Sequence, residues 1–282
     1  MDPISLLKRY DIRPSKGLGQ NFLIREGVVE RILEASELSP QDLVLEVGAG
    51  LGLLTRRLAE RASAVVAVEL DRKMVPILAD TLQGAANVHI VQADILQVDP
   101  PQLMVRELAL PDMGSLRYKV VANLPYYITS AVLRHLLDTK VRPERLVVMV
   151  QKEVAQRIVA SAGDLSLLAI SVQVFGMPEI ITSIPASAFY PRPKVDSALL
   201  RVCVYEEPRV PEEEIASFFR VVRAGFGQKR RQLHNSLMHN LHLPHDAVLA
   251  ALHQANIAPA RRPQTLEVEE WVRLACFFKA EG

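Results

Sequence analysis

The segment from Asn123 to Thr129 (Asn-Leu-Pro-Tyr-Tyr-Ile-Thr) brings together side chains that could grip a flat ring carrying an amino group. The Asn123 side chain can accept a hydrogen bond from an NH2 group, and Tyr126 can stack on a ring face. Pro125 has a fixed φ and stiffens the turn between them. An ordinary strand-to-helix turn, with Asn as a helix cap and the tyrosines in the core, is the alternative. This segment alone does not decide between the two.

The elements around this segment predict where it lies. The apolar run 118–122 predicts a buried strand before it, and the pattern at 130–137 predicts a helix after it. Further strands alternate with helical patterns, and they are predicted at residues 43–47, 64–68, 88–92 and 146–150. This alternation predicts an α/β fold with a doubly wound, mostly parallel sheet. Such sheets bind their ligands at the carboxyl ends of the strands, where Asn123 lies.

The carboxyl-terminal part of the chain has a different pattern. Strands at 180–184 and 198–204 could form an antiparallel pair at one edge of the sheet, and residues 212–282 show only helical periodicity. The segment 206–211 (Glu-Glu-Pro-Arg-Val-Pro) reads as a linker. We therefore expect a catalytic domain at 1–207 and a small all-α domain at 208–282.

Two stretches give weaker signals. Residues 1–25 are basic and rich in turn-forming residues, and we expect an irregular segment there. Residues 99–117 hold three prolines and Gly114, and we expect a surface excursion.

A glycine turn at 48–52 (Gly-Ala-Gly-Leu-Gly) joins a predicted strand to a predicted helix. Glycines let a backbone approach a ligand closely, and a helix start offers free N–H groups. The dinucleotide fingerprint GxGxxG would need a glycine where this chain has Leu53. The GxGxG spacing is instead common in enzymes that use S-adenosylmethionine.

Carboxylates end the next two predicted strands. Glu69 could accept hydrogen bonds from both hydroxyls of a ribose, and Asp94 from the amine of an adenine. Three successive strand ends that present Gly, Glu and Asp indicate a nucleoside-bearing cofactor. A glycine turn followed by two solvated acids is the alternative.

With such a cofactor in place, the strand that ends at Asn123 would face its sulfonium methyl group. The amine nitrogen of adenine is a poor nucleophile because its lone pair is delocalised into the ring. The side-chain oxygen of Asn123 and the backbone carbonyl of Leu124 could accept both amine hydrogens and favour a tetrahedral nitrogen. Tyr126 would stack on the base. No strong base is required, but the adenine must be flipped out or single-stranded.

Phe189 is a candidate for the opposite wall of this site. Prolines at 185, 191 and 193 stiffen the loop around it, and a rigid aromatic loses little entropy when it stacks on a base. An aromatic plug over the sheet edge is the alternative. We expect Tyr127 and Tyr190 to be packing or supporting groups.

Over nearly its whole length, the chain resembles the ribosomal RNA adenine dimethyltransferases. The stretches that carry the resemblance are 18–23 (Leu-Gly-Gln-Asn-Phe-Leu), 45–55, 68–71, 93–95, 123–126, 151–157 and 189–197. The resemblance implies a Rossmann-like class I methyltransferase that takes its methyl groups from S-adenosyl-L-methionine. The excursion at 99–117 departs from the family pattern, but it lies between the motifs.

The resemblance also assigns roles to individual residues. It implies cofactor contacts from Asn21, Leu23, Gly48, Gly50, Glu69, Asp94 and Asn123. It places the catalytic site at Asn123, Leu124, Pro125, Tyr126 and Phe189, with Phe189 stacking on the target adenine.

The implied reaction converts two adjacent adenosines near the 3′ end of small-subunit (16S) ribosomal RNA to N6,N6-dimethyladenosine during ribosome biogenesis. The implied partner is this RNA within an assembling ribosomal particle. Two alternatives stay open. One is a resistance-type enzyme that methylates large-subunit RNA. The other is an assembly or transcription factor that uses the same fold mainly for binding.

A local basic region is the best candidate for RNA contact, since the net charge of the 282-residue chain is only +1. No Asp or Glu occurs between Ile215 and His245. The cations of that span are Arg220, Arg223, Lys229, Arg230 and Arg231. Such a patch would supply affinity for phosphates, whereas a solvated helix face is the alternative.

The remaining features exclude several classes. Two cysteines without a CxxC pair give no disulfide framework, and the histidines at 234, 239, 242 and 245 are not spaced for one helical face, so no metal site is expected. The amino terminus lacks the apolar core of a signal peptide, and no apolar run reaches the length of a membrane span. We expect a cytoplasmic protein that is not bound to membranes and acts as a monomer.

Overall fold

The computed structural model describes residues 3–228 and 231–278. The chain forms two compact units. The first, called the sheet unit, comprises Met1–Ala155 and Pro178–Val204, and the second, called the helical unit, comprises Gln156–Met177 and Tyr205–Gly282. The chain therefore passes between the units three times, whereas the sequence suggested one boundary between residues 207 and 208.

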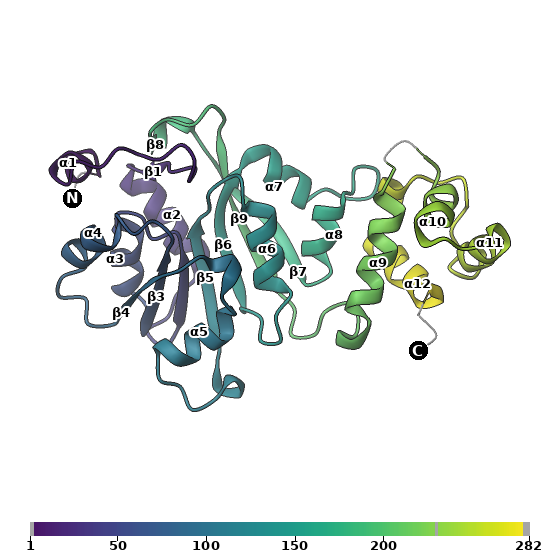
Figure 1. Ribbon diagram of the computed structural model, residues 1–282, viewed down its shortest axis with the longest axis horizontal. Coiled ribbons are helices and arrows are strands. Elements are labelled where there is room, and N and C mark those ends of the chain that lie inside the picture. Colours follow the sequence, from purple (N-terminus) through teal and green to yellow (C-terminus); the bar gives the residue numbers. More distant parts are fainter. Residues whose placement is uncertain (1–2, 229–230, 279–282) are drawn as a thin grey trace. The chain divides into compact units, whose positions relative to one another are not determined.

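A seven-stranded sheet forms the centre of the sheet unit (Figure 1). The strand order is β4-β3-β2-β5-β6-β9-β7. The bounds are β2 Leu43–Val47, β3 Ala64–Glu69, β4 Val88–Gln92, β5 Tyr118–Asn123, β6 Arg145–Gln151, β7 Gly176–Ile184 and β9 Ser197–Val204. The strands β4, β3, β2, β5 and β6 run parallel to one another, and β9 runs antiparallel to β6. The predicted doubly wound, mostly parallel sheet is confirmed, and the two late strands lie at its edge as neighbours.

The order of the strands creates a switch point between β2 and β5. From β2 the chain runs outward through β3 to β4, and then returns to the other side of β2 as β5. Because parallel crossovers are right-handed, a reversal of direction puts the connecting helices on opposite faces. Helices α3 (Leu53–Ala59) and α4 (Val75–Thr81) connect the strands on one side of the switch point, from β2 to β4. Helix α6 (Thr129–Leu137) connects β5 to β6 on the other side (Figure 1). The segments that follow the carboxyl ends of β2 and β5 lead in opposite directions, and this leaves a crevice there.

Apolar side chains on the strands hold these layers together. Val44, Val65 and Val121 pack in one cluster with residues of α2 (Glu26–Ser36) and α3. All three valines are fully buried, as near-continuous apolar strands of a covered parallel sheet must be. The strand ends are thereby fixed in position for the polar residues that follow them.

Two regions differ from what the sequence suggested. The stretch 99–117 is not an irregular excursion throughout, since residues Pro100–Glu107 form helix α5. Asp99 caps this helix by accepting a hydrogen bond from the Gln102 N–H at 2.9 Å, and Leu103 and Met104 are buried. The prolines stand at the first helical positions, where no N–H bond is lost.

The amino-terminal segment is also more ordered than expected. Pro3–Arg9 forms helix α1, and its Leu6 and Leu7 pack in a core cluster with residues of α4. Residues Phe22–Leu23 form the short strand β1, which pairs with β8 (Phe189–Tyr190). The segment that carries Asn21 is thus held by packing on both sides.

Apart from the first two residues of β7, the regular elements in the described part of the helical unit are helices. Besides α8 (Leu167–Gln173), they are α9 Ile215–Phe226, α10 Leu233–Leu241, α11 His245–Gln254 and α12 Val268–Ala275. Trp271 of α12 is fully buried and stacks on Phe226, with ring centroids 5.4 Å apart. A Cβ at Gly225 would lie 2.4 Å from the Trp271 ring, so only glycine allows α9 to approach this indole so closely.

Helix α7 (Lys152–Ile158) completes the described helices. Among residues 3–228 and 231–278, no helix is both long and apolar enough to cross a bilayer.

Candidate active site

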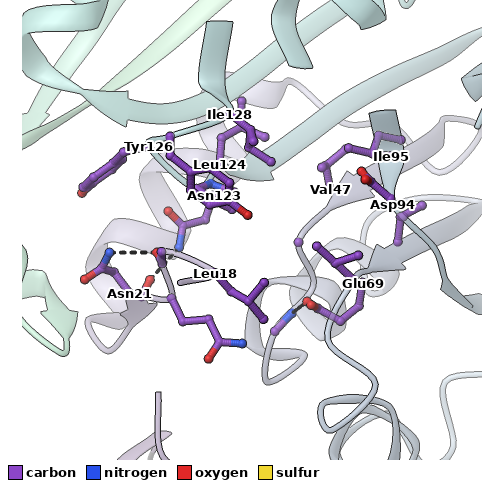
Figure 2. Close-up of a pocket in the computed structure, with 18 of the residues that line it drawn as sticks. Leu18, Asn21, Val47, Glu69, Asp94, Ile95, Asn123, Leu124, Tyr126 and Ile128 are labelled. Carbon is purple, nitrogen blue, oxygen red and sulfur yellow. Dashed lines mark hydrogen bonds between the residues drawn. The ribbon is translucent and has the colours of Figure 1, made fainter. Parts of the chain in front are cut away.

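A pocket opens at the switch point of the sheet and encloses about 780 Å³, counting the part open to solvent. Its walls come from residues of five segments, at 18–22, 47–50, 68–70, 93–95 and 123–128. Figure 2 shows Glu69 and Asp94 on one side and Asn123, Leu124 and Tyr126 on the other. The first side is called the cofactor half here, and the second the acceptor half. The structure thus brings the predicted strand ends together around one space of the usual size for a small-molecule site.

Glu69, at the end of β3, is held by backbone donors on both sides. Its Oε2 accepts the Gly50 N–H at 2.7 Å, and its Oε1 accepts the Asp71 N–H at 2.8 Å. The side chain belongs to a residue that is only 7% exposed, and burial raises the pKa of this carboxyl above its usual range. Each oxygen keeps a further lone pair, so the group can still accept hydroxyl donors from a ligand.

The glycine turn fits closely against the amino-terminal segment. Gly48 and Gly50 both have positive φ, at 78° and 57°. A Cβ at Gly50 would lie 3.3 Å from two carbons of the Phe22 ring. The absence of a side chain therefore lets Phe22 cover the turn while the Gly50 N–H points to Glu69.

Asp94 follows β4 and begins a short 3-10 helix, Ile95–Gln97. Its Oδ1 accepts the Leu96 N–H at 3.0 Å. The other carboxylate oxygen has no hydrogen-bond partner in the described part of the chain, and both Asp94 and Ile95 line the pocket. This oxygen is free to accept an amine hydrogen from a ligand.

In the acceptor half, Asn123 is oriented by the amino-terminal segment. Its Nδ2 donates to the Asn21 carbonyl oxygen at 3.0 Å (Figure 2). This bond fixes the amide so that Oδ1, which has no partner among the described residues, remains as an acceptor. The Leu124 carbonyl likewise receives no hydrogen bond from that part of the chain. The Pro125 carbonyl accepts from Ile128 N and Thr129 Oγ1, both at 3.2 Å, and so holds the turn.

Tyr126 is fixed by a residue of strand β9. Its hydroxyl lies 2.7 Å from Ser197 Oγ, and Ser197 at the start of β9 is fully buried. Burial raises the pKa of Tyr126, so the phenol stays neutral at physiological pH. The bond restrains the tilt of the ring that lines the pocket.

A family model described as "Ribosomal RNA adenine dimethylase" matches residues 13–280. The chain belongs to the ribosomal RNA adenine dimethylase family. The match spans both units, and the expected resemblance is thereby confirmed.

Curated relatives agree with this membership. A protein of Dehalococcoides mccartyi named "Ribosomal RNA small subunit methyltransferase A" is 45% identical over 277 residues, covering 98% of this chain and 92% of that protein. A protein of the same name from Pelotomaculum thermopropionicum is 43% identical over 281 residues, covering 98% and 95% of the two chains. The predicted small-subunit assignment is therefore favoured over the alternatives.

Two solved structures share the architecture. The 23S rRNA methyltransferase ErmE has a TM-score of 0.71 at 30% identity, with 92% of this chain and 99% of that chain covered. A dimethyladenosine transferase from Plasmodium falciparum has a TM-score of 0.75 at 23% identity, with 90% and 95% covered. The fold is thus that of the class I ribosomal RNA methyltransferases.

Two of the residues that the family motifs assign to the site lie outside the main pocket. Leu23 lines a smaller adjoining hollow together with Gly48, Gly50 and Asn123. Phe189 pairs with Leu23 across the β1–β8 ladder, and its side chain packs in the core at 3% exposure. The structure does not bring Phe189 into the pocket opposite Tyr126. Its role as the second wall stays a prediction and requires the ring to leave the core when RNA binds.

Two residues of the site were not foreseen from the sequence. No separate role was assigned to Ser197 from the sequence, whereas its hydroxyl positions Tyr126. Glu46 is the acid within the apolar strand β2; it lines the hollow beside Gly48, and its Oε2 has no partner among the described residues. Burial, with the nearby Glu69 carboxylate, raises the pKa of Glu46 to about 8. An acid within an apolar strand, two residues before the glycine turn, was the available signal for it.

The predicted basic patch belongs to the helical unit. Arg223 and Arg231 are exposed, and their side chains have no hydrogen-bond or ion-pair partner among the described residues, whereas the Arg220 side chain donates to the Phe278 carbonyl at 2.6 Å. Arg220 and Arg223 are three residues apart on α9 and share a face. Lys229 and Arg230 lie outside the described residues. Within those residues, no group of three or more His, Cys, Asp or Glu side chains is arranged to hold a metal ion.

Proposed function

We propose that this protein transfers methyl groups from S-adenosylmethionine to N6 of two adjacent adenosines near the 3′ end of small-subunit ribosomal RNA. The product would be N6,N6-dimethyladenosine, which requires four transfers per RNA. One observation carries the proposal. Carboxylates suited to a nucleoside cofactor and free carbonyl acceptors suited to an adenine amine face each other across one pocket.

The cofactor half fits the family's methyl donor. S-adenosylmethionine supplies an electrophilic methyl group on a sulfonium sulfur when it is bound. Glu69 would accept the ribose hydroxyls with its remaining lone pairs, and Asp94 would accept the adenine amine. Gly48 and Gly50 allow the backbone to approach the ligand, and Asn21 lines the same space.

The acceptor half supports attack by a weakly nucleophilic amine. Asn123 Oδ1 and the Leu124 carbonyl would each accept one amine hydrogen. These bonds strengthen as the nitrogen becomes tetrahedral, so they favour the transition state over the ground state. Tyr126 would stack on the flipped base and hold the nitrogen in line with the methyl group. The proton can leave to water after transfer, because no charged leaving group needs it.

We further propose that the protein acts as a monomer in the cytoplasm, on an assembling small-subunit particle. Support for a monomer comes from the pocket, since both of its halves are built by one chain. Light scattering of the purified protein tests this expectation, and a stable dimer would contradict it.

The exposed arginines of the helical unit are proposed to contact RNA phosphates, together with Lys229 and Arg230. Exchange of Arg223 and Arg231 for Ala should weaken binding to the particle and make it less dependent on salt. Cofactor affinity, measured by calorimetry, should not change, and a loss of it would contradict a role confined to RNA.

The proposal is tested by mapping the modified nucleotides. Purified protein is incubated with labelled cofactor and unmethylated small-subunit particles, and the products are located by mass spectrometry. Dimethylation of two adjacent adenosines near the 3′ end is the expected result, with no transfer by Asn123→Ala protein over the same time. No transfer by the wild type, or equal transfer by both proteins, would refute the proposal.

The similarity to ErmE supports a second candidate, methylation of large-subunit RNA. The same assay with large-subunit particles separates the two activities. Preference for large-subunit particles would support the second candidate. Absence of cofactor binding in a titration would instead support a factor that uses the fold only for binding.

A further inference from the structure

Tyr127 is an exposed aromatic ring at the mouth of the pocket. Its neighbour Tyr126 is tied inward to Ser197, but Tyr127 is 58% exposed and still lines the pocket. Of the two expected roles, packing or support, the exposure excludes packing in the core. Among the described residues its hydroxyl has no hydrogen-bond partner, so neither burial nor a polar contact explains an aromatic at this position.

The ring is nevertheless held in a defined place. Gly19 has a φ of 60°, and a Cβ there would lie 3.1 Å from Cδ1 and 3.3 Å from Cε1 of Tyr127. The same turn is fixed by hydrogen bonds from Ile128 and Thr129 to the Pro125 carbonyl. One part of the ring is thus supported by backbone while the rest faces solvent. A rigid, half-supported ring costs little entropy when it stacks on a base.

Base flipping leaves a neighbouring base without a stacking partner, and an exposed aromatic ring can stack on that base. When the target adenine leaves its stack to enter the pocket, the base beside it loses a stacking partner. That base then lies at the pocket mouth, because it is joined to the flipped nucleotide by one phosphodiester. Aromatic stacking on an unpaired base is worth about 1–3 kcal/mol and works with any base.

We propose that Tyr127 is a stacking platform for the nucleobase adjacent to the adenine that occupies the pocket. The inference rests on the proposed function and adds a second base-binding position to the same site. It assigns Tyr126 to the base that reacts and Tyr127 to its neighbour. Stacking would act on RNA affinity, and the cofactor half would not be involved.

The test compares Tyr127→Ala, Tyr127→Leu, Tyr127→Phe and Tyr127→Trp with the wild type on unmethylated small-subunit particles. Loss of the ring in the Ala and Leu variants should raise KM for the particle by about 5- to 150-fold, which corresponds to the stacking energy. The Phe and Trp variants should restore KM to within about threefold of the wild type. Cofactor Kd should stay unchanged in all four.

Tyr205→Leu is the matched control, because Tyr205 is a partly exposed tyrosine whose ring lies under Arg209 and does not line the pocket. Its KM should equal that of the wild type. A second readout uses a 3′-terminal RNA hairpin with 2-aminopurine beside the target adenine. Stacking on Tyr127 should quench its fluorescence on binding, and Tyr127→Leu should abolish the quenching.

The outcomes separate this inference from the proposed function. No methyl transfer by the wild type refutes the function. Equal KM values and equal fluorescence for the wild type and Tyr127→Leu overturn the platform. A parallel rise of KM and cofactor Kd in Tyr127→Leu also overturns it, since the ring would then only shape the pocket.

Discussion

The two halves of the pocket differ in how far the protein itself already hydrogen-bonds their acceptor oxygens. In the cofactor half, the oxygens of Glu69 are both occupied by backbone N–H groups, and Asp94 caps a helical turn. In the acceptor half, Asn123 Oδ1 and the Leu124 carbonyl receive no hydrogen bond from the described residues. The Asn123 side chain is held instead through its Nδ2, which donates to the Asn21 carbonyl.

This difference has a physical reason. A binding site can use a carboxylate that also holds its own turn, because each oxygen has lone pairs to spare. A site that must favour a transition state keeps its acceptor atoms free for the substrate and orients them through hydrogen bonds made by neighbouring atoms. Damage to the first half should therefore change cofactor affinity, and damage to the second should change the rate.

The largest effect is expected for Asn123→Ala. Loss of one preoriented acceptor should lower the single-turnover rate of methyl transfer by about 10²- to 10³-fold, the cost seen when comparable transition-state hydrogen bonds are removed. Asn87→Ala is the matched control, since its amide also donates to backbone carbonyls but lies outside the pocket. A rate within a factor of five of the wild type for Asn123→Ala would contradict the claim that the acceptor half sets the rate of methyl transfer.

Glu69→Gln should act on affinity. An amide cannot accept from Gly50 and Asp71 with both of its ends, so one backbone N–H would meet an NH2 group. We expect cofactor Kd to rise by about 10- to 100-fold, as for loss of a hydrogen bond to a charged group. Calorimetric titration measures it. The control is Glu179→Gln, since the exposed Glu179 carboxylate pairs with Arg201 and lies outside the pocket, and equal Kd values in the two variants would contradict the role of Glu69.

Glu46 should make stability depend on pH. Its pKa is about 8 in the folded protein, above the ordinary value of 4.5. Between these values the folded state holds a proton that the unfolded chain has lost. The free energy of unfolding should therefore fall as pH rises, by up to about 1.4 kcal/mol per pH unit, and level off above pH 8.

Urea unfolding of the wild type and Glu46→Gln at several pH values checks this expectation. The amide cannot ionise, so the variant should gain stability relative to the wild type as pH rises from about 5 to 8. A constant difference across the window would show that Glu46 keeps an ordinary pKa.

The smallest effect is expected for Ser197→Ala. Loss of one neutral hydrogen bond to Tyr126 is worth about 0.5–1.5 kcal/mol, so kcat/KM for the particle should fall by about 2- to 13-fold. Tyr126→Phe removes the same bond and should behave alike. The double variant should be no worse than either single one, and additive losses would mean that the two residues act separately.

The sheet and the strand ends could be predicted because their signals are local. Apolar runs mark the strands, and Gly48, Glu69, Asp94 and Asn123 each stand within two residues of the end of one. Helix α5 was missed because Pro100 and Pro101 read as breakers, although a proline at the first turn of a capped helix is favourable.

Contacts between distant segments could not be predicted in this way. Tyr126 and Ser197 are 71 residues apart, and no periodicity marks their bond. The burial of Phe189 depends on the pairing of β1 with β8, two strands of two residues each. The inclusion of Gln156–Met177 in the helical unit likewise results from tertiary contacts, and composition gives no sign of it.

The most direct test of this difference measures, for each variant, the quantity that its substitution should leave nearly unchanged. Cofactor Kd is measured for Asn123→Ala, and the single-turnover rate at saturating cofactor is measured for Glu69→Gln. We expect each value to stay within about tenfold of the wild type, a change of no more than about 1.4 kcal/mol. If Asn123→Ala loses cofactor binding, or Glu69→Gln loses turnover, to the same extent as the other variant, the division of the pocket into a cofactor half and an acceptor half is wrong.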